Sequence, residues 1–156
     1  MAGEKYEDKA IANLLGWFEN NLQTYLTAVE TAQSLTAGTL APPVDYVPGD
    51  LGDDPRSPLL LVFCTGSEEY ENTRSLHRNS CVARLRFTSD ADIEAGKLLA
   101  RRYKTALLDT VYADRTLGGS VVHAIIIEET TDGVAMSDAE TSHAIDIGVE
   151  VVTHDA

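Results

Sequence analysis

The stretch "YADRTLGGSVVHAIIIEE", residues 112–129, decides the fold, because it opens as the end of a helix and closes as a strand. Gly118 and Gly119 stand at the junction. Glycine adopts positive φ without steric cost, so the chain can reverse there and enter a strand at once, while Leu117 folds back onto the last helical turn. The sequence therefore predicts a structural turn at Leu117, Gly118 and Gly119.

Before this turn, the spacing of apolar side chains predicts a helix over residues 90–112, with a capping-box-like start at Ser89 and Asp92. Lys97, Arg101 and Lys104 form a basic stripe on a side of this helix that is distinct from its apolar side. Such a stripe is typical of a solvated face. In a chain with a net charge of −13, it is also the natural complement of an acidic patch on an identical neighbour.

After the turn, two strands are predicted, over residues 120–129 and 142–154. The second alternates strictly, with four branched side chains directed inward at Ile145, Ile147, Val149 and Val151. The residues between them, 130–141, indicate a turn or a flexible tip. We expect the two strands to pair antiparallel.

Two further strands are predicted earlier in the chain. "LLLVFC", residues 59–64, is a continuous apolar run of the kind found in strands that are covered on both faces. "SCVARLRFTS", residues 80–89, alternates, and places Arg84 and Arg86 on its polar side. These runs predict an antiparallel hairpin with a long polar tip. Together with the basic stripe, Arg84 and Arg86 make up the predicted contact between subunits.

The N-terminal part of the chain predicts a long helix followed by an irregular segment. Residues 4–34 carry apolar side chains at helical spacing, with Trp17 off the main stripe as either a core residue or a partner contact. Residues 36–58 contain all five prolines of the protein. Proline at this density excludes helix and interrupts sheet ladders. The segment is therefore interpreted as an extended arm on a neighbouring molecule, through Pro42, Pro43, Tyr46 and Pro48, or as a surface loop.

These elements predict a single α+β domain over residues 1–156. Its two layers are a four-stranded, mainly antiparallel sheet made of two β-hairpins and a covering layer of two helices, in the order α-β-β-α-β-β. The first residues lack the apolar core of a signal peptide, and no run approaches the ~20 apolar residues of a membrane span. We therefore expect a protein that is made in the cytosol and has no membrane partner.

The distribution of charged residues argues against nucleic-acid binding. Residues 116–156 contain no lysine or arginine and eight acids, whereas binding of phosphate backbones needs clustered Lys and Arg. The acidity indicates solubility, or a surface past which something acidic moves without adhering.

The sequence offers little sign of chemistry. Its four histidines lack the spacing of a zinc site, although His123 and His143 fall in adjacent predicted strands and can meet there. Cys64 and Cys81 are either buried thiols or a cross-strand disulfide, depending on register. We predict no catalytic residue, no metal and no cofactor. Two alternatives stay open: a small hydrolase that uses one of the cysteines with a histidine, and a ligand-binding regulatory α+β domain.

The stretch "LLDTVYADRTLGGSVVHAIIIEE", residues 107–129, followed by a variable tip and an alternating terminal strand, resembles the tail-terminator and tail-completion proteins of long-tailed bacteriophages. The pair "LLLVFC … CVARLRFTS" and the long N-terminal helix fit the same order of elements, and the resemblance covers residues 58–155. The proline-rich segment is longer than that pattern requires.

The resemblance implies a subunit that assembles into a hexameric ring. Such a ring caps the tail tube, stops its growth and joins the tail to the neck of the capsid, so the implied partners are other copies of the chain, the major tail tube protein and a neck or head-completion protein. DNA would pass through the lumen without specific binding. The implied location is the virion tail and neck, after assembly in the host cytoplasm. A head-completion or neck adaptor protein of related fold is the alternative within this class.

Overall fold

Two helices and five strands make up the part of the chain that the structure, a computed structural model, describes: residues 2–49, 56–70, 73–89, 92–136 and 141–154. In chain order they are α1 (Ala2–Ala32), β1 (Asp45–Pro48), β2 (Leu59–Tyr70), β3 (Thr73–Ser89), α2 (Ile93–Tyr112), β4 (His123–Met136) and β5 (Thr141–His154).

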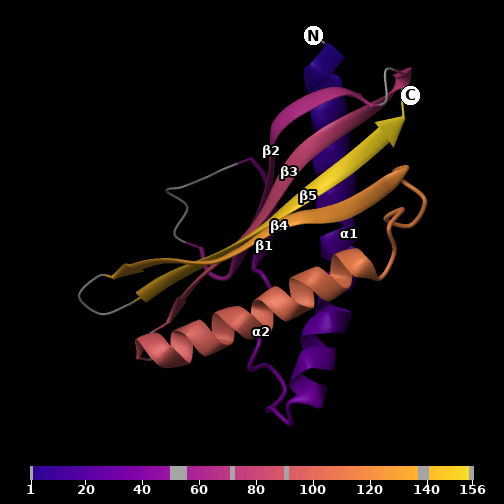
Figure 1. Cartoon of the computed structure of the whole chain (residues 1–156). Coiled ribbons are helices and arrows are strands. Elements are labelled where there is room, and N and C mark those ends of the chain that lie inside the picture. Colours follow the sequence, from indigo (N-terminus) through magenta and orange to yellow (C-terminus); the bar gives the residue numbers. More distant parts are fainter. Residues whose placement is uncertain (1, 50–55, 71–72, 90–91, 137–140, 155–156) are drawn as a thin grey trace.

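The strands form one sheet in the order β1-β2-β3-β5-β4. β1 pairs parallel with β2, and all the other neighbours are antiparallel. Both helices lie on the same face of this sheet (Figure 1). The predicted α+β class and the two antiparallel pairs are confirmed.

The prediction of a four-stranded sheet is wrong by one strand, which lies in the proline-rich segment. Asp45 to Pro48 pair with Leu59 to Val62 and add an edge strand to β2. Proline interrupts a ladder only where its missing N–H is needed, and an edge strand tolerates it at its end. The β-branched and aromatic residues between Pro43 and Pro48 were the available signal for this strand.

Both hairpins are longer than predicted. Residues 65–78, expected to be a polar tip, largely extend β2 and β3, and β4 continues to Met136. The polar residues pair across the ladder, as in the ion pair between Glu68 and Arg78, and such pairs sustain strands beyond the apolar core. The predicted tip residues 137–140 lie outside the described residues. The second helix begins at Ile93 because Asp92 caps it, accepting a hydrogen bond from the Ala95 N–H at 2.8 Å.

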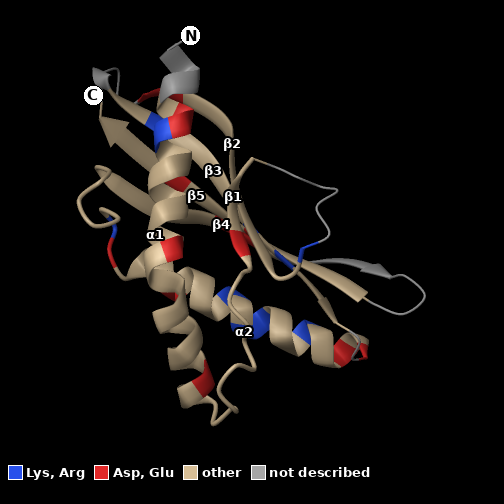
Figure 2. Cartoon of the chain, turned by 180° about the vertical axis from the view of Figure 1, so that it is seen from behind, with Lys and Arg blue, Asp and Glu red and all other residues tan. Residues whose placement is uncertain are grey.

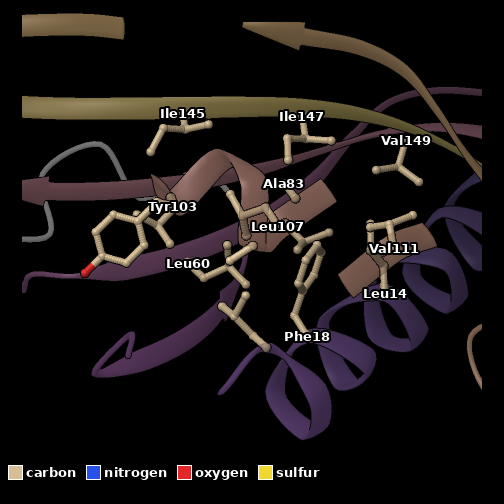
Figure 3. Close-up of a cluster of buried hydrophobic side chains, with 14 of the residues drawn as sticks. Leu14, Phe18, Leu60, Ala83, Tyr103, Leu107, Val111, Ile145, Ile147 and Val149 are labelled. Carbon is tan, nitrogen blue, oxygen red and sulfur yellow. The ribbon is translucent and has the colours of Figure 1, made fainter. Parts of the chain in front are cut away.

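The core lies between the helices and the sheet. Phe18 of α1 points toward Leu107 of α2, and Leu14 of α1 lies beside Val111 of α2 (Figure 3); all four are fully buried. Each such side chain contributes about 1.5–3 kcal/mol of transfer free energy. The four residues from Leu59 to Val62 are also fully buried. The prediction that this run is covered on both faces is therefore confirmed for residues 59–62, whereas its last two residues, Phe63 and Cys64, are only partly buried.

The helix-to-strand turn has the predicted backbone. Leu117, Gly118 and Gly119 have φ values of 49°, 74° and 87°, which is the left-handed region that glycine favours and leucine does not. The Asp114 carboxylate accepts hydrogen bonds from Thr116 and from the Gly118 N–H. Trp17 packs beside Gly118 and donates from its indole N–H to the Thr110 carbonyl at 2.7 Å. Trp17 therefore joins α1 to α2 and to the turn within the subunit.

Candidate interaction surfaces

The helix-free face of the sheet carries an apolar row across four strands. Phe63 pairs with Val82, and Val82 pairs with Gly148. On β4, the bulge after Ile126 places Ile127 beside Gly148, with its Cγ1 3.5 Å from the position of a Cβ at that glycine. We call Phe63, Val82, Gly148 and Ile127 the central row.

The β4 end of the central row is exposed. Ile127 is 56% exposed, and Ile125 on the same face is 36% exposed. Single apolar side chains on a surface are ordinary, whereas an apolar group that spans several strands marks an interaction site. The central row is therefore a candidate contact with another protein.

Charged side chains flank the central row. On one side, Arg84 pairs with Asp146 through contacts of 2.8 Å and 3.0 Å, and its guanidinium lies 5.2 Å from the centroid of the Phe63 ring. On the other side, Glu150 lies 3.2 Å from Arg78. Glu128 is exposed at the register position of Gly148. Because the arginines lie on β3 and the acids on β4 and β5, the β4–β5 half of this face is acidic.

The second candidate surface is the solvent side of α2. Leu98 is 39% exposed and Tyr112 is 58% exposed, and they lie on one side of the helix together with the exposed Arg101 and Thr105. Figure 2 shows the basic residues gathered on α2 and acidic residues along α1. We call Leu98, Arg101, Thr105 and Tyr112 the outer α2 stripe.

The five basic residues predicted to form one contact lie on different parts of the subunit. Arg84 and Arg86 belong to the sheet, and Arg84 is held by Asp146. Lys104 lies 3.5 Å from Glu129 of β4, so its charge is balanced within the subunit. Lys97 and Arg101 have no ion pair among the described residues, so of the five predicted residues these two remain available to a partner.

The residues of the predicted arm lie on their own subunit. Pro43 is buried, and Tyr46 packs against the main core, where burial and then the charge of Glu19 raise the pKa of its hydroxyl. Pro42 and Pro48 are exposed. A contact between these two prolines and a partner stays a prediction. The segment around them is not a free arm, because β1 is part of the sheet.

The cysteines are direct cross-strand partners, and both are free thiols. A hydrogen bond with Cys64, and then burial, raise the pKa of the Cys81 thiol. A raised pKa disfavours the thiolate, which is the nucleophilic form. His123 and His143, which the sequence allowed to meet, do not, because His123 pairs with Val152 near one end of β5 and His143 is buried near the other end.

A hollow of about 200 Å³ lies beside the turn. Seven residues line it: Ala12, Asn13, Gly16, Trp17, Asn20, Leu117 and Ser120. It is smaller than the ~300–1,000 Å³ that is usual for small-molecule sites. Within the described residues, no three His, Cys, Asp or Glu side chains converge on a position for a metal ion.

Comparison with known proteins finds no family model and no curated protein that matches this chain. Neither described helix combines the length and the apolarity that crossing a bilayer requires. The geometry of the two surfaces is therefore the main structural guide to function.

Sequence reasoning missed both apolar surfaces, although each left a local signal. In "AIIIEE", three consecutive isoleucines exceed what one face of a strand can bury, because side chains alternate between faces. In "KLLARR", Leu98 and Leu99 are adjacent on a helix, so only one of them can face the core fully. Ile125 and Ile127 are the exposed residues of the first run, and Leu98 is the exposed residue of the second.

Proposed function

We propose that this chain is a phage tail terminator, which assembles as a homo-oligomeric ring, caps the tail tube, stops its polymerisation and joins the tail to the neck. The sequence around the helix-to-strand turn supports this proposal through its resemblance to that class. The observation that carries it furthest is the pair of unlike surfaces, the central row and the outer α2 stripe, on opposite sides of one small subunit. Unlike surfaces generate head-to-tail contacts, and these close into rings when the rotation fits.

The charge distribution is compatible with a ring around DNA. The chain has a net charge of −13, and an acidic lumen repels a phosphate backbone, so DNA would move through without adhering. Electrostatics would guide subunits into place, since exposed ion pairs contribute only about 0–1 kcal/mol each. The apolar surfaces would supply most of the free energy of assembly.

The test is capping of tail tubes. Tubes polymerised from the tail tube protein of the same genome are mixed with the purified chain, and their lengths are followed by light scattering and electron microscopy. We expect rings at tube ends and arrested elongation, with bovine serum albumin at equal concentration leaving growth unchanged. A chain that stays monomeric at high concentration and does not bind tubes contradicts the proposal. Rings that leave tubes untouched but bind capsid portals favour a head-completion or neck adaptor role.

A further inference from the structure

The two apolar surfaces of the subunit point in opposite directions. The buried side of α2 packs onto the sheet, so the outer α2 stripe faces away from it. The central row lies on the sheet face that bears no helix (Figure 1). The subunit is thus a two-layer unit whose outer helix side and bare sheet side are both partly apolar.

The two surfaces complement each other in layer type. Helices cover one face of the sheet, and the bare face is the position that a third layer would occupy. Gly148 has no side chain, and the space of its missing Cβ is taken by β4: the Glu128 Cβ lies 3.0 Å from that position and the Ile127 Cγ1 3.5 Å from it. In the outer α2 stripe, Leu98 is exposed and is the apolar residue that lies next to basic residues, Lys97 and Arg101.

Their charges also match. Lys97 and Arg101 flank Leu98 on α2, while Glu128, Asp146 and Glu150 flank the central row on β4 and β5. Asp146 and Glu150 already have arginine partners. Glu128 is exposed and has no ion pair among the described residues, so it is the acid best placed to receive a base from outside the subunit.

We propose that the outer α2 stripe of one copy docks on the central row of the next, with Leu98 over the row and Arg101 beside Glu128. A second copy of this chain is therefore the partner for both surfaces. This inference rests on the proposed function and deepens it, because it assigns the contact that builds the ring.

Two substitutions each disable one surface. Leu98→Glu places a charge in the outer α2 stripe, and Ile127→Lys places one in the central row. Val44→Lys is the matched control, because Val44 is 59% exposed and belongs to neither surface. Sedimentation velocity on the full chain should show assembly of the wild type and of Val44→Lys, and at least a tenfold weaker association for each of the other two. Circular dichroism verifies that all variants are folded.

Mixing the two disabled variants tests the head-to-tail geometry. Leu98→Glu keeps an intact central row, and Ile127→Lys keeps an intact outer α2 stripe. If the surfaces bind each other, the mixture forms one-to-one dimers that cannot grow further. A mixture that stays monomeric, or a single variant that dimerises by itself, overturns the proposal.

A charge exchange tests the proposed neighbours. Arg101→Glu and Glu128→Arg should each weaken association, and the double variant should recover most of it, since the pair is restored with its signs reversed. Recovery of less than half of the loss overturns this part of the assignment. Rings that assemble regardless of all these changes refute the assigned contact and leave the terminator proposal standing. A wild type that is monomeric in solution and also fails to cap tubes refutes both.

Discussion

Gly96 of α2 gives the sharpest test of the packing. A Cβ at this position would lie 2.2 Å from Nε2 and 2.7 Å from Cε1 of His143, which is far inside van der Waals contact. The His143 ring is buried and stacks on Phe87 with a centroid separation of 4.9 Å, and Phe87 in turn packs on Tyr103 at 5.1 Å. The imidazole therefore cannot move far enough to avoid the added methyl group.

Two opposing effects set the change in unfolding free energy that Gly96→Ala should cause. Overpacking a core typically costs 1–3 kcal/mol, and an overlap this deep belongs at the upper end of that range. Alanine in place of glycine inside a helix gains about 1 kcal/mol. Gly96→Ala should therefore lower the free energy of unfolding by roughly 2 kcal/mol.

Gly16 supplies the matched control, because it also lies within a helix and no atom outside the backbone of that helix lies within 4 Å of its Cβ position. Gly16→Ala should raise the free energy of unfolding by roughly 0.5–1 kcal/mol. Urea denaturation followed by circular dichroism measures both variants. His143→Ala combined with Gly96→Ala should be less unstable than the sum of the single changes, since removing the ring removes the clash. A Gly96→Ala protein as stable as the wild type would refute the reasoning.

Three further predictions concern the turn, its acid and the thiols. Gly119→Ala should lower the free energy of unfolding by about 1–2 kcal/mol in urea denaturation, because φ is 87° there. Gly118→Ala should lower it further, because its Cβ would also lie 3.3 Å from Trp17. Wild-type stability of both variants contradicts this prediction. Hydrogen bonds from the Thr116 hydroxyl, and then from N–H groups, lower the pKa of Asp114 in the folded protein. The stability that this carboxylate contributes is therefore present above its unfolded pKa and is lost as pH falls through the lower folded pKa. In urea titrations, Asp114→Asn should flatten the fall of unfolding free energy at acid pH, and an unchanged slope counts against this prediction. The Cys81 thiol is buried and its pKa is raised, so it should resist glutathione disulfide in the folded protein and react only after unfolding in urea, as thiol titration measures; rapid loss of both thiols from the folded protein contradicts this.

Local periodicity predicted the elements whose burial follows from nearest neighbours in sequence. The alternation from Ile145 to Val151 places four fully buried side chains on one face of β5. The glycines of the turn take positive φ as expected, because no other residue does so without steric cost. In both cases the decisive physics lies within a few residues.

The features that could not be predicted depend on partners far away in the chain. β1 is a strand because it borders β2 in space, whereas its prolines locally disfavour a ladder. Lys104 looked available to another subunit, but it is balanced by Glu129 from β4. The division of the basic residues between two surfaces becomes visible only when the register is known.

The turn and the bulge in β4 together explain why two opposed surfaces exist. The Ala124 N–H donates to the Arg115 carbonyl at 2.6 Å, so the turn anchors the start of β4 and holds its register. A slip of one residue would turn Ala124 and Ile126 outward and Ile125 inward, exchanging the two faces. The bulge then adds one residue, which keeps Ile127 and Glu128 on the open face and returns Glu129 to the helix side beside Lys104. A helix joined so tightly to a bulged edge strand leaves apolar residues on both outer sides, as the proposed head-to-tail assembly would require.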